Sequence, residues 1–144
     1  MSLRHLSVPA ILVVILSAAA CSRDPEVAKQ RHFAKGNTYR DAGKYREAIL
    51  EYRTAIRYDA KFAEARLALA EAYSQSSELH SAFREYVRAA DLLPERTDVQ
   101  LKAGNFLLVA GRFDEAKARA ERVLHRDPKN ADAQVLLGLS LIHI

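Results

Sequence analysis

The chain has 144 residues, a mass of 16.1 kDa and a formal net charge of +4, which corresponds to one domain of ordinary size. Its residues are 49% hydrophobic and 28% charged, too apolar for a disordered chain and too charged for a protein with many membrane spans. Five glycines and four prolines are too few for the turns of a β-sandwich or barrel. One cysteine excludes a disulfide framework and a cysteine-rich zinc site.

The N-terminal segment has the order of features of an export signal. A basic start with Arg4 is followed by an apolar run over 6–16 and by small residues over 17–20. This order is typical of a secretory signal peptide. The alternative is a transmembrane anchor, but Arg23 ends the run before it reaches the roughly 20 apolar residues that a span needs. We therefore predict that residues 1–20 form a signal peptide that is removed on export.

The single cysteine, Cys21, directly follows these small residues. Small residues before a cysteine at the end of an apolar run resemble the lipobox of bacterial lipoproteins, although Ala18 stands where the commonest lipobox has leucine. The resemblance implies that Cys21 carries diacylglycerol and a further acyl chain, which anchor a lipidated linker over 21–28 in a membrane. Ser22 in the next position implies sorting to the periplasmic face of the outer membrane. The alternative is an ordinary cleavage site with an unmodified cysteine.

The rest of the chain repeats with a period of 34 residues. Three segments align without a gap, 29–62, 63–96 and 97–130, and residues 131–144 begin a fourth. Each copy carries the same small and apolar slots. The first small slot holds Gly36, Ala70, Gly104 and Gly138, and the slot three residues later holds Tyr39, Tyr73, Leu107 and Leu141. Such a register indicates a repeat architecture. The alternative is an unrelated antiparallel helical bundle.

Each copy has the pattern of two helices joined by a tight turn. In the first copy the predicted first helix covers 32–42, and Gly43 lets the chain turn. Apolar residues over 45–56 recur at helical spacing and predict a second, amphipathic helix. Pro94 and Pro128 end the second helices of the next two copies, because proline cannot continue a helix. One hairpin cannot bury its apolar face alone, so the hairpins must stack.

These slots resemble the tetratricopeptide repeat in length and in the glycine, tyrosine, alanine and proline positions, over about 115 residues. One slot departs from the family pattern. The residues in place of its usual tryptophan are His32, Arg66, Gln100 and Gln134. The resemblance implies an all-α fold, an α-solenoid of stacked helical hairpins over 29–144.

The resemblance also implies a groove that binds a protein or an extended peptide on the face formed by the first helix of each repeat. The slots selected as groove residues are Phe33, Asn37, Arg40, Leu67, Glu71, Leu101, Asn105 and Leu108. The two asparagines offer donors and an acceptor to a peptide backbone, and the apolar members offer pockets. The alternative is that these side chains only pack between helices or face solvent.

One known use of this face is predicted to be absent. Chaperone-binding members of the family grip the terminal carboxylate of a peptide with lysines and an arginine on the first helices. Here Phe33, Ala68 and Asp98 occupy slots of that clamp, and only Lys102 matches it.

Positive charge is concentrated in the first repeat. The first repeat, 29–62, has nine lysines and arginines against four acids, so it could lie against anionic head groups; the alternative is a solvated surface.

The sequence lacks a phosphate-binding loop, a zinc-binding histidine pair and a serine nucleophile elbow. Aromatic residues lie in packing slots, which argues against nucleic acid. We predict no enzyme activity, no metal and no cofactor.

These features predict an exported, lipid-anchored scaffold for protein–protein interaction in an envelope assembly or export complex. The alternative is the N-terminal interaction module of a longer, truncated protein whose catalytic or export domain lies downstream. The chain stops about one helix into the fourth repeat, on largely apolar residues over 141–144. We expect self-association through this uncovered C-terminal helix.

Overall fold

The structure is a computed structural model that describes residues 24–142. Its helices are α2 (Pro25–Asp41), α3 (Tyr45–Tyr58), α4 (Ala63–Gln75), α5 (Leu79–Leu92), α6 (Thr97–Val109), α7 (Phe113–Arg126) and α8 (Ala131–Leu141). No strand occurs within this range, which confirms the predicted all-α class. The predicted signal peptide and Cys21 lie outside the described residues.

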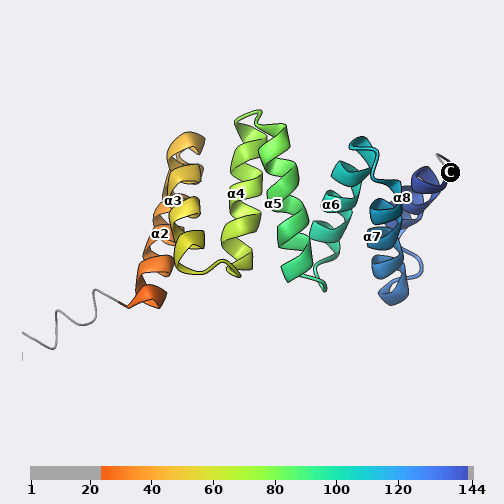
Figure 1. Ribbon diagram of the computed structural model, residues 1–144, viewed down its shortest axis with the longest axis horizontal. Helices are drawn as coiled ribbons and strands as arrows, with labels where there is room; N and C mark the ends of the chain where they lie inside the picture. The colour runs from red at the N-terminus through yellow and green to blue at the C-terminus, as the bar shows by residue number, and fades with distance from the viewer. Residues whose placement is uncertain (1–23, 143–144) are drawn as a thin grey trace, which may run out of the picture.

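The helices lie side by side in chain order, from α2 and α3 at one end of the molecule to α8 at the other (Figure 1). Three hairpins, α2 with α3, α4 with α5 and α6 with α7, pack against one another, and α8 packs against α6 and α7. Because α2 also contacts α4, the first helices of these two repeats share one side of the row. Of the helices described, none is long and apolar enough to cross a membrane.

Helix α2 begins four residues before the predicted repeat boundary at 29. Asp24 caps it, since the Asp24 side chain accepts a hydrogen bond from the Glu26 amide at 2.9 Å. Pro25 occupies the first helical turn, where its fixed φ and missing N–H suit a helix start. Residues 25–28, predicted from the sequence to be part of a linker, are therefore helical.

Each complete hairpin turns through a residue with positive φ. Gly43, Ser77 and Gly111 hold the same slot, with φ values of 70°, 62° and 72°. At the second turn the Glu78 amide donates to the Tyr73 carbonyl at 2.9 Å, the bond that closes a Schellman motif. Ser77 carries a Cβ atom in a conformation that glycine adopts freely, so this turn stores backbone strain.

Small residues let neighbouring helices approach closely, both within a hairpin and between repeats. A Cβ atom on Gly36 would lie 2.5 Å from Cε1 of Tyr52, a fully buried ring on α3. A Cβ atom on Gly104 would collide with Leu136 of α8. The small slot is therefore needed for packing in both places, as the repeat pattern predicts.

Polar pairs occupy the slot that holds tryptophan in the tetratricopeptide pattern. In three successive repeats this side chain bonds the side chain 19 residues further along. The pairs are His32 with Glu51 (2.7 Å), Arg66 with Glu85 (2.7 Å) and Gln100 with Arg119 (3.2 Å). Arg66 also donates to the Ala60 carbonyl at 2.9 Å, which ties α4 to the loop before it. The pairs hold the two helices of a repeat together through hydrogen bonds in place of apolar contact.

Candidate peptide-binding groove

A cavity of about 320 Å³ lies over α4, between α2 and α6, and we name it the inner groove. The residues that line it are Arg40, Tyr45, Glu71, Ala72, Ser74, Gln75, Tyr86 and Lys102. Half of these come from α4, which forms the floor, while α2 and α6 contribute one long cationic side chain each. The volume is within the usual range of ligand sites, about 300–1,000 Å³.

Charges of both signs surround the inner groove. The Arg40 Nε donates to Asp41 Oδ1 at 3.0 Å. The Lys102 ammonium lies 5.4 Å from the centre of the Tyr86 ring, a cation–π contact. Glu71 is exposed on α4 and makes no salt bridge with the residues of the described range. A ligand with both donors and acceptors therefore finds partners here.

Ser74 gives the groove an unsatisfied polar atom. Its hydroxyl oxygen is buried and has no hydrogen-bond partner among the described residues. An unpaired buried hydroxyl costs about 1–3 kcal/mol. A ligand group that bonds the Ser74 hydroxyl would remove that cost, and this would contribute to the free energy of ligand binding.

The polar groove residues selected from the sequence have different environments. Arg40 and Glu71 line the inner groove. Asn37 is half-buried, and its side-chain oxygen accepts a hydrogen bond from the Tyr52 hydroxyl at 2.8 Å. Asn105 is exposed on α6 and bonds none of the residues that the structure describes. The inner groove thus brings together two of these four side chains.

The apolar groove residues selected from the sequence are all half-buried and contribute to helix packing. The Phe33 ring centre lies 4.9 Å from that of Phe62. Leu67 packs against the buried cluster around Val99, and Leu101 and Leu108 pack against the cluster that the α6, α7 and α8 helices share. Each side chain therefore stabilises the stack and leaves only part of its surface for a ligand.

Tyr52 connects the core to the polar face of α2. Burial raises the pKa of the Tyr52 hydroxyl above its ordinary value of 10.0, and the positive charge of Arg40 offsets this only in part. The hydroxyl therefore stays protonated at neutral pH and keeps donating to Asn37. This bond fixes the orientation of the Asn37 amide.

Sequence reasoning missed four residues that line the inner groove: Tyr45, Ala72, Gln75 and Tyr86. The two tyrosines come from second helices, whose slots the repeat pattern assigns to packing. Tyr86 is 1% exposed, so only the three-dimensional arrangement shows that its ring reaches the cavity. Gln75 is the last residue of α4 and lies beyond the recurrent slots.

A row of antiparallel helical hairpins with a groove along one helix layer defines a helical repeat scaffold. Within the described residues no group of three or more His, Cys, Asp or Glu side chains could hold a metal ion. Two family models match the chain, "TPR repeat" over residues 36–77 and "Tetratricopeptide repeat" over residues 75–139. The chain is therefore built from tetratricopeptide repeats, a typical non-catalytic module for protein–protein interaction.

Known proteins share this architecture at low identity. Mouse superkiller complex protein 3 is 25% identical over 132 residues, 92% of this chain and 8% of that protein. An uncharacterized protein of Haemophilus influenzae is 26% identical over 117 residues, 81% of this chain and 65% of that protein. The chain thus spans less than two thirds of the length of either relative.

A solved structure with the same fold contains a bound peptide. The second TPR domain of human RPAP3, in complex with the HSP70 peptide SGPTIEEVD, is 26% identical with a TM-score of 0.63. The match covers 81% of this chain and 98% of that domain.

Proposed function

We propose that this chain is an exported, lipid-anchored scaffold that binds an extended segment of a partner protein in the inner groove. The observation that carries the proposal is the cavity over α4, with the unpaired Ser74 hydroxyl and the charged side chains of Arg40, Glu71 and Lys102. An extended peptide offers donors and acceptors along its whole backbone. It can therefore pair with these groups without a fixed sequence.

The segment that we propose is internal and not an acidic C-terminus of the HSP70 type. Phe33 stands in a clamp slot and packs against Phe62. Asp98 stands in another clamp slot and accepts from Arg96 at 2.8 Å, which lowers the pKa of the Asp98 carboxyl. Asp98 is therefore ionised at neutral pH and paired with Arg96, so this slot offers no free cation to a terminal carboxylate.

A photo-crosslinking side chain tests the groove. We place p-benzoylphenylalanine at Gln75, which lines the inner groove, and at Ala118, an exposed residue of α7 outside it. In intact envelopes we expect discrete adducts from position 75 that disappear when Arg40 and Lys102 are both changed to Glu, and none from position 118. Equal adducts from both positions, or adducts that survive the charge reversal, would contradict peptide binding in this groove.

The envelope location in the proposal rests on the N-terminal sequence. Acyl chains on Cys21 would hold the helical array at the periplasmic face of the outer membrane, where it would serve an assembly or export complex. Labelled palmitate should enter the wild type and the matched variant Ser22→Ala, and should be absent from Cys21→Ala. Equal labelling of all three chains, or of none, would remove the lipoprotein part of the proposal and leave the groove untouched.

We further propose that α8 mediates self-association. The exposed apolar side chains on α8 and directly after it include Val135 (60% exposed), Leu139 (43%) and Ile142 (74%), which form an uncovered apolar surface. In the alternative of a longer chain, a following helix would cover them. Light scattering should show dimers of the wild type that Leu139→Lys dissociates. Val109→Lys, which changes an exposed residue of α6, is the control and should leave the mass unchanged.

A further inference from the structure

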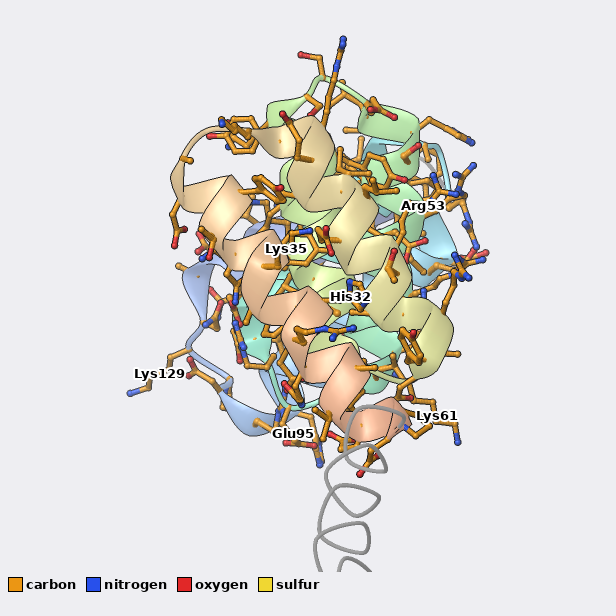
Figure 2. The ribbon with its side chains drawn as sticks, turned by 90° about the vertical axis from the view of Figure 1, so that its left-hand side faces the viewer. His32, Lys35, Arg53, Lys61, Glu95 and Lys129 are labelled. Carbon is orange, nitrogen blue, oxygen red and sulfur yellow. The ribbon has the colours of Figure 1, made fainter. Side chains whose placement is uncertain are left out.

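A second cavity, of about 540 Å³, lies over α4 between the second helices α3 and α5. We name it the arginine groove. The residues that line it are Arg53, Ile56, Arg57, Arg66, Leu69, Tyr73, Glu78, Ser81, Arg84, Glu85 and Arg88. None of these residues lines the inner groove, so α4 presents different side chains to the two cavities. Figure 2 shows Arg53 on the side of α3 that points away from α2.

Three of the five arginines of this cavity are free to bind a ligand. Arg66 and Arg88 both donate to Glu85, at 2.7 Å and 2.9 Å, and use both oxygens of that carboxylate. By contrast, Arg53, Arg57 and Arg84 are exposed and bond none of the residues in the described range. They come from α3 and α5, so their guanidinium groups flank the cavity from two sides.

The floor between these arginines is apolar. Ile56 and Leu69 belong to the buried or half-buried surface where α3 meets α4, and Tyr73 packs beside them. Burial raises the pKa of the Tyr73 hydroxyl, while the charges of Arg53 and Arg84 lower it. Both guanidinium groups therefore act electrostatically on the floor of the cavity.

We propose that the arginine groove is a second binding surface, which takes an acidic peptide segment with an apolar side chain between its carboxylates. The guanidinium groups of Arg53, Arg57 and Arg84 pair with the carboxylates, since the planar fork of arginine matches a carboxylate in two hydrogen bonds. The apolar side chain lies on Ile56 and Leu69. This surface faces away from the inner groove and does not depend on it.

The same residues favour a peptide over other polyanions. Nucleic acid and an anionic membrane present negative charge continuously, and Glu78 in the cavity wall repels such charge. A single-stranded nucleic acid also needs exposed aromatic rings for stacking, whereas the one aromatic residue of this cavity, Tyr73, is half-buried in its floor. A peptide can place its carboxylates at the unpaired arginines alone and fill the floor with an aliphatic side chain.

Fluorescence anisotropy tests this surface with a short labelled peptide that alternates pairs of glutamates with single leucines. The test variant is Arg53→Gln/Arg84→Gln, which removes two unpaired cations without breaking any bond. The matched control, Arg46→Gln/Lys129→Gln, removes two exposed cations outside the cavity, one of them on the same helix α3. Comparison ligands are an all-glutamate peptide, a single-stranded oligonucleotide and vesicles containing phosphatidylglycerol.

The glutamate–leucine peptide should bind the wild type and the control equally, and the test variant about tenfold or more weakly. The all-glutamate peptide should bind more weakly than the glutamate–leucine peptide, because it leaves the floor empty. Equal affinity of the test variant and the wild type would overturn the proposal. So would loss of binding in Lys102→Gln, which would place the peptide in the inner groove, or tighter binding of the oligonucleotide or the vesicles than of the peptide.

Discussion

The inner groove and the arginine groove have α4 in common and differ in the helices that supply their charges. The inner groove takes single charges of both signs from first helices and holds an unpaired hydroxyl, Ser74. The arginine groove takes most of its charge from the second helices α3 and α5, with five arginines against two glutamates. The two cavities over α4 therefore differ in chemistry, because different neighbouring helices supply their charged side chains.

The departure from the tetratricopeptide pattern contributes to this difference. Arg66 stands in the tryptophan slot, bonds Glu85 and lines the arginine groove. In the next repeat the same slot holds Gln100, which pairs with Arg119 and donates to the Ala90 carbonyl at 2.5 Å. The polar pair therefore links the two helices of its hairpin by hydrogen bonds, and in the second repeat Arg66 also brings charge to the arginine groove.

The largest expected effect comes from the paired charges of the arginine groove, compared with a charge in the same cavity that makes no salt bridge within the described range. Glu85→Gln leaves Arg66, whose side chain is 12% exposed, without a charged partner, and should lower the free energy of unfolding by about 2–4 kcal/mol. Glu78→Gln changes an exposed glutamate of the same cavity and should change it by less than about 0.5 kcal/mol. Urea unfolding measures both. Equal losses of unfolding free energy in the two variants would contradict a stabilising role for the buried Arg66–Glu85 pair.

The next effect concerns two buried or half-buried tyrosines, Tyr52 of α3 and Tyr73 of α4. The pKa values of Tyr52 and Tyr73 are raised above 10.0 by burial, so the fold favours their protonated forms. Their contribution to stability is therefore complete below pH 10 and is lost as the pH rises through the folded-state values. Tyr52→Phe should cost about 1 kcal/mol at pH 7, because Asn37 loses its donor, and should make the alkaline loss less steep. An unchanged alkaline profile in urea unfolding would contradict this role of burial.

A smaller effect should have opposite signs for stability and for binding. Ser74→Ala removes the unpaired buried hydroxyl and should stabilise the fold by about 0.5–1 kcal/mol, while weakening a ligand of the inner groove. Ser76→Ala, two residues further along the chain, is the control for a nearby serine that does not line the cavity. If Ser74→Ala destabilised the fold, the hydroxyl would have a partner in solution and the groove would lose its unpaired group.

The last effect, of similar size, tests the turn that follows α4. Ser77→Gly should stabilise the chain by about 0.5–1 kcal/mol, since glycine accepts the positive φ of 62° without strain. Gly111→Ser makes the reverse change in the same slot of the next repeat and should destabilise it by a similar amount. Thermal unfolding of the two variants measures both shifts, and shifts of the same sign would exclude strain at this slot as their cause.

The sequence predicts most of the fold because the repeat constrains it. The period of 34 residues places small residues such as Gly36 in one slot and Gly43, Ser77 and Gly111 at equivalent turns. The structure confirms the turns, and it identifies Tyr52 as the ring that packs on Gly36. The start of α2 was not predicted, because the cap at Asp24 and Pro25 lies before the first recurrent slot.

The grooves could be predicted only in part. Arg40 and Glu71 follow from the helix face that the family pattern assigns to ligands. The arginine groove does not follow from that pattern, since Arg53 and Arg84 occupy different slots of their repeats and meet only when α3 and α5 flank α4. The recurrence of Glu51, Glu85 and Arg119 at the repeat period was a signal in the sequence for the polar pairs beside these surfaces.

Crosslinking of the glutamate–leucine peptide from both sides of α4 tests most directly whether this helix separates two binding surfaces. We place p-benzoylphenylalanine at Gln75 in one variant and at Ser81 in another, residues that line the inner groove and the arginine groove respectively. The peptide should form its adducts mainly from position 81, and these should decline with added salt. Adducts mainly from position 75, or equal adducts from both, would contradict two separate surfaces.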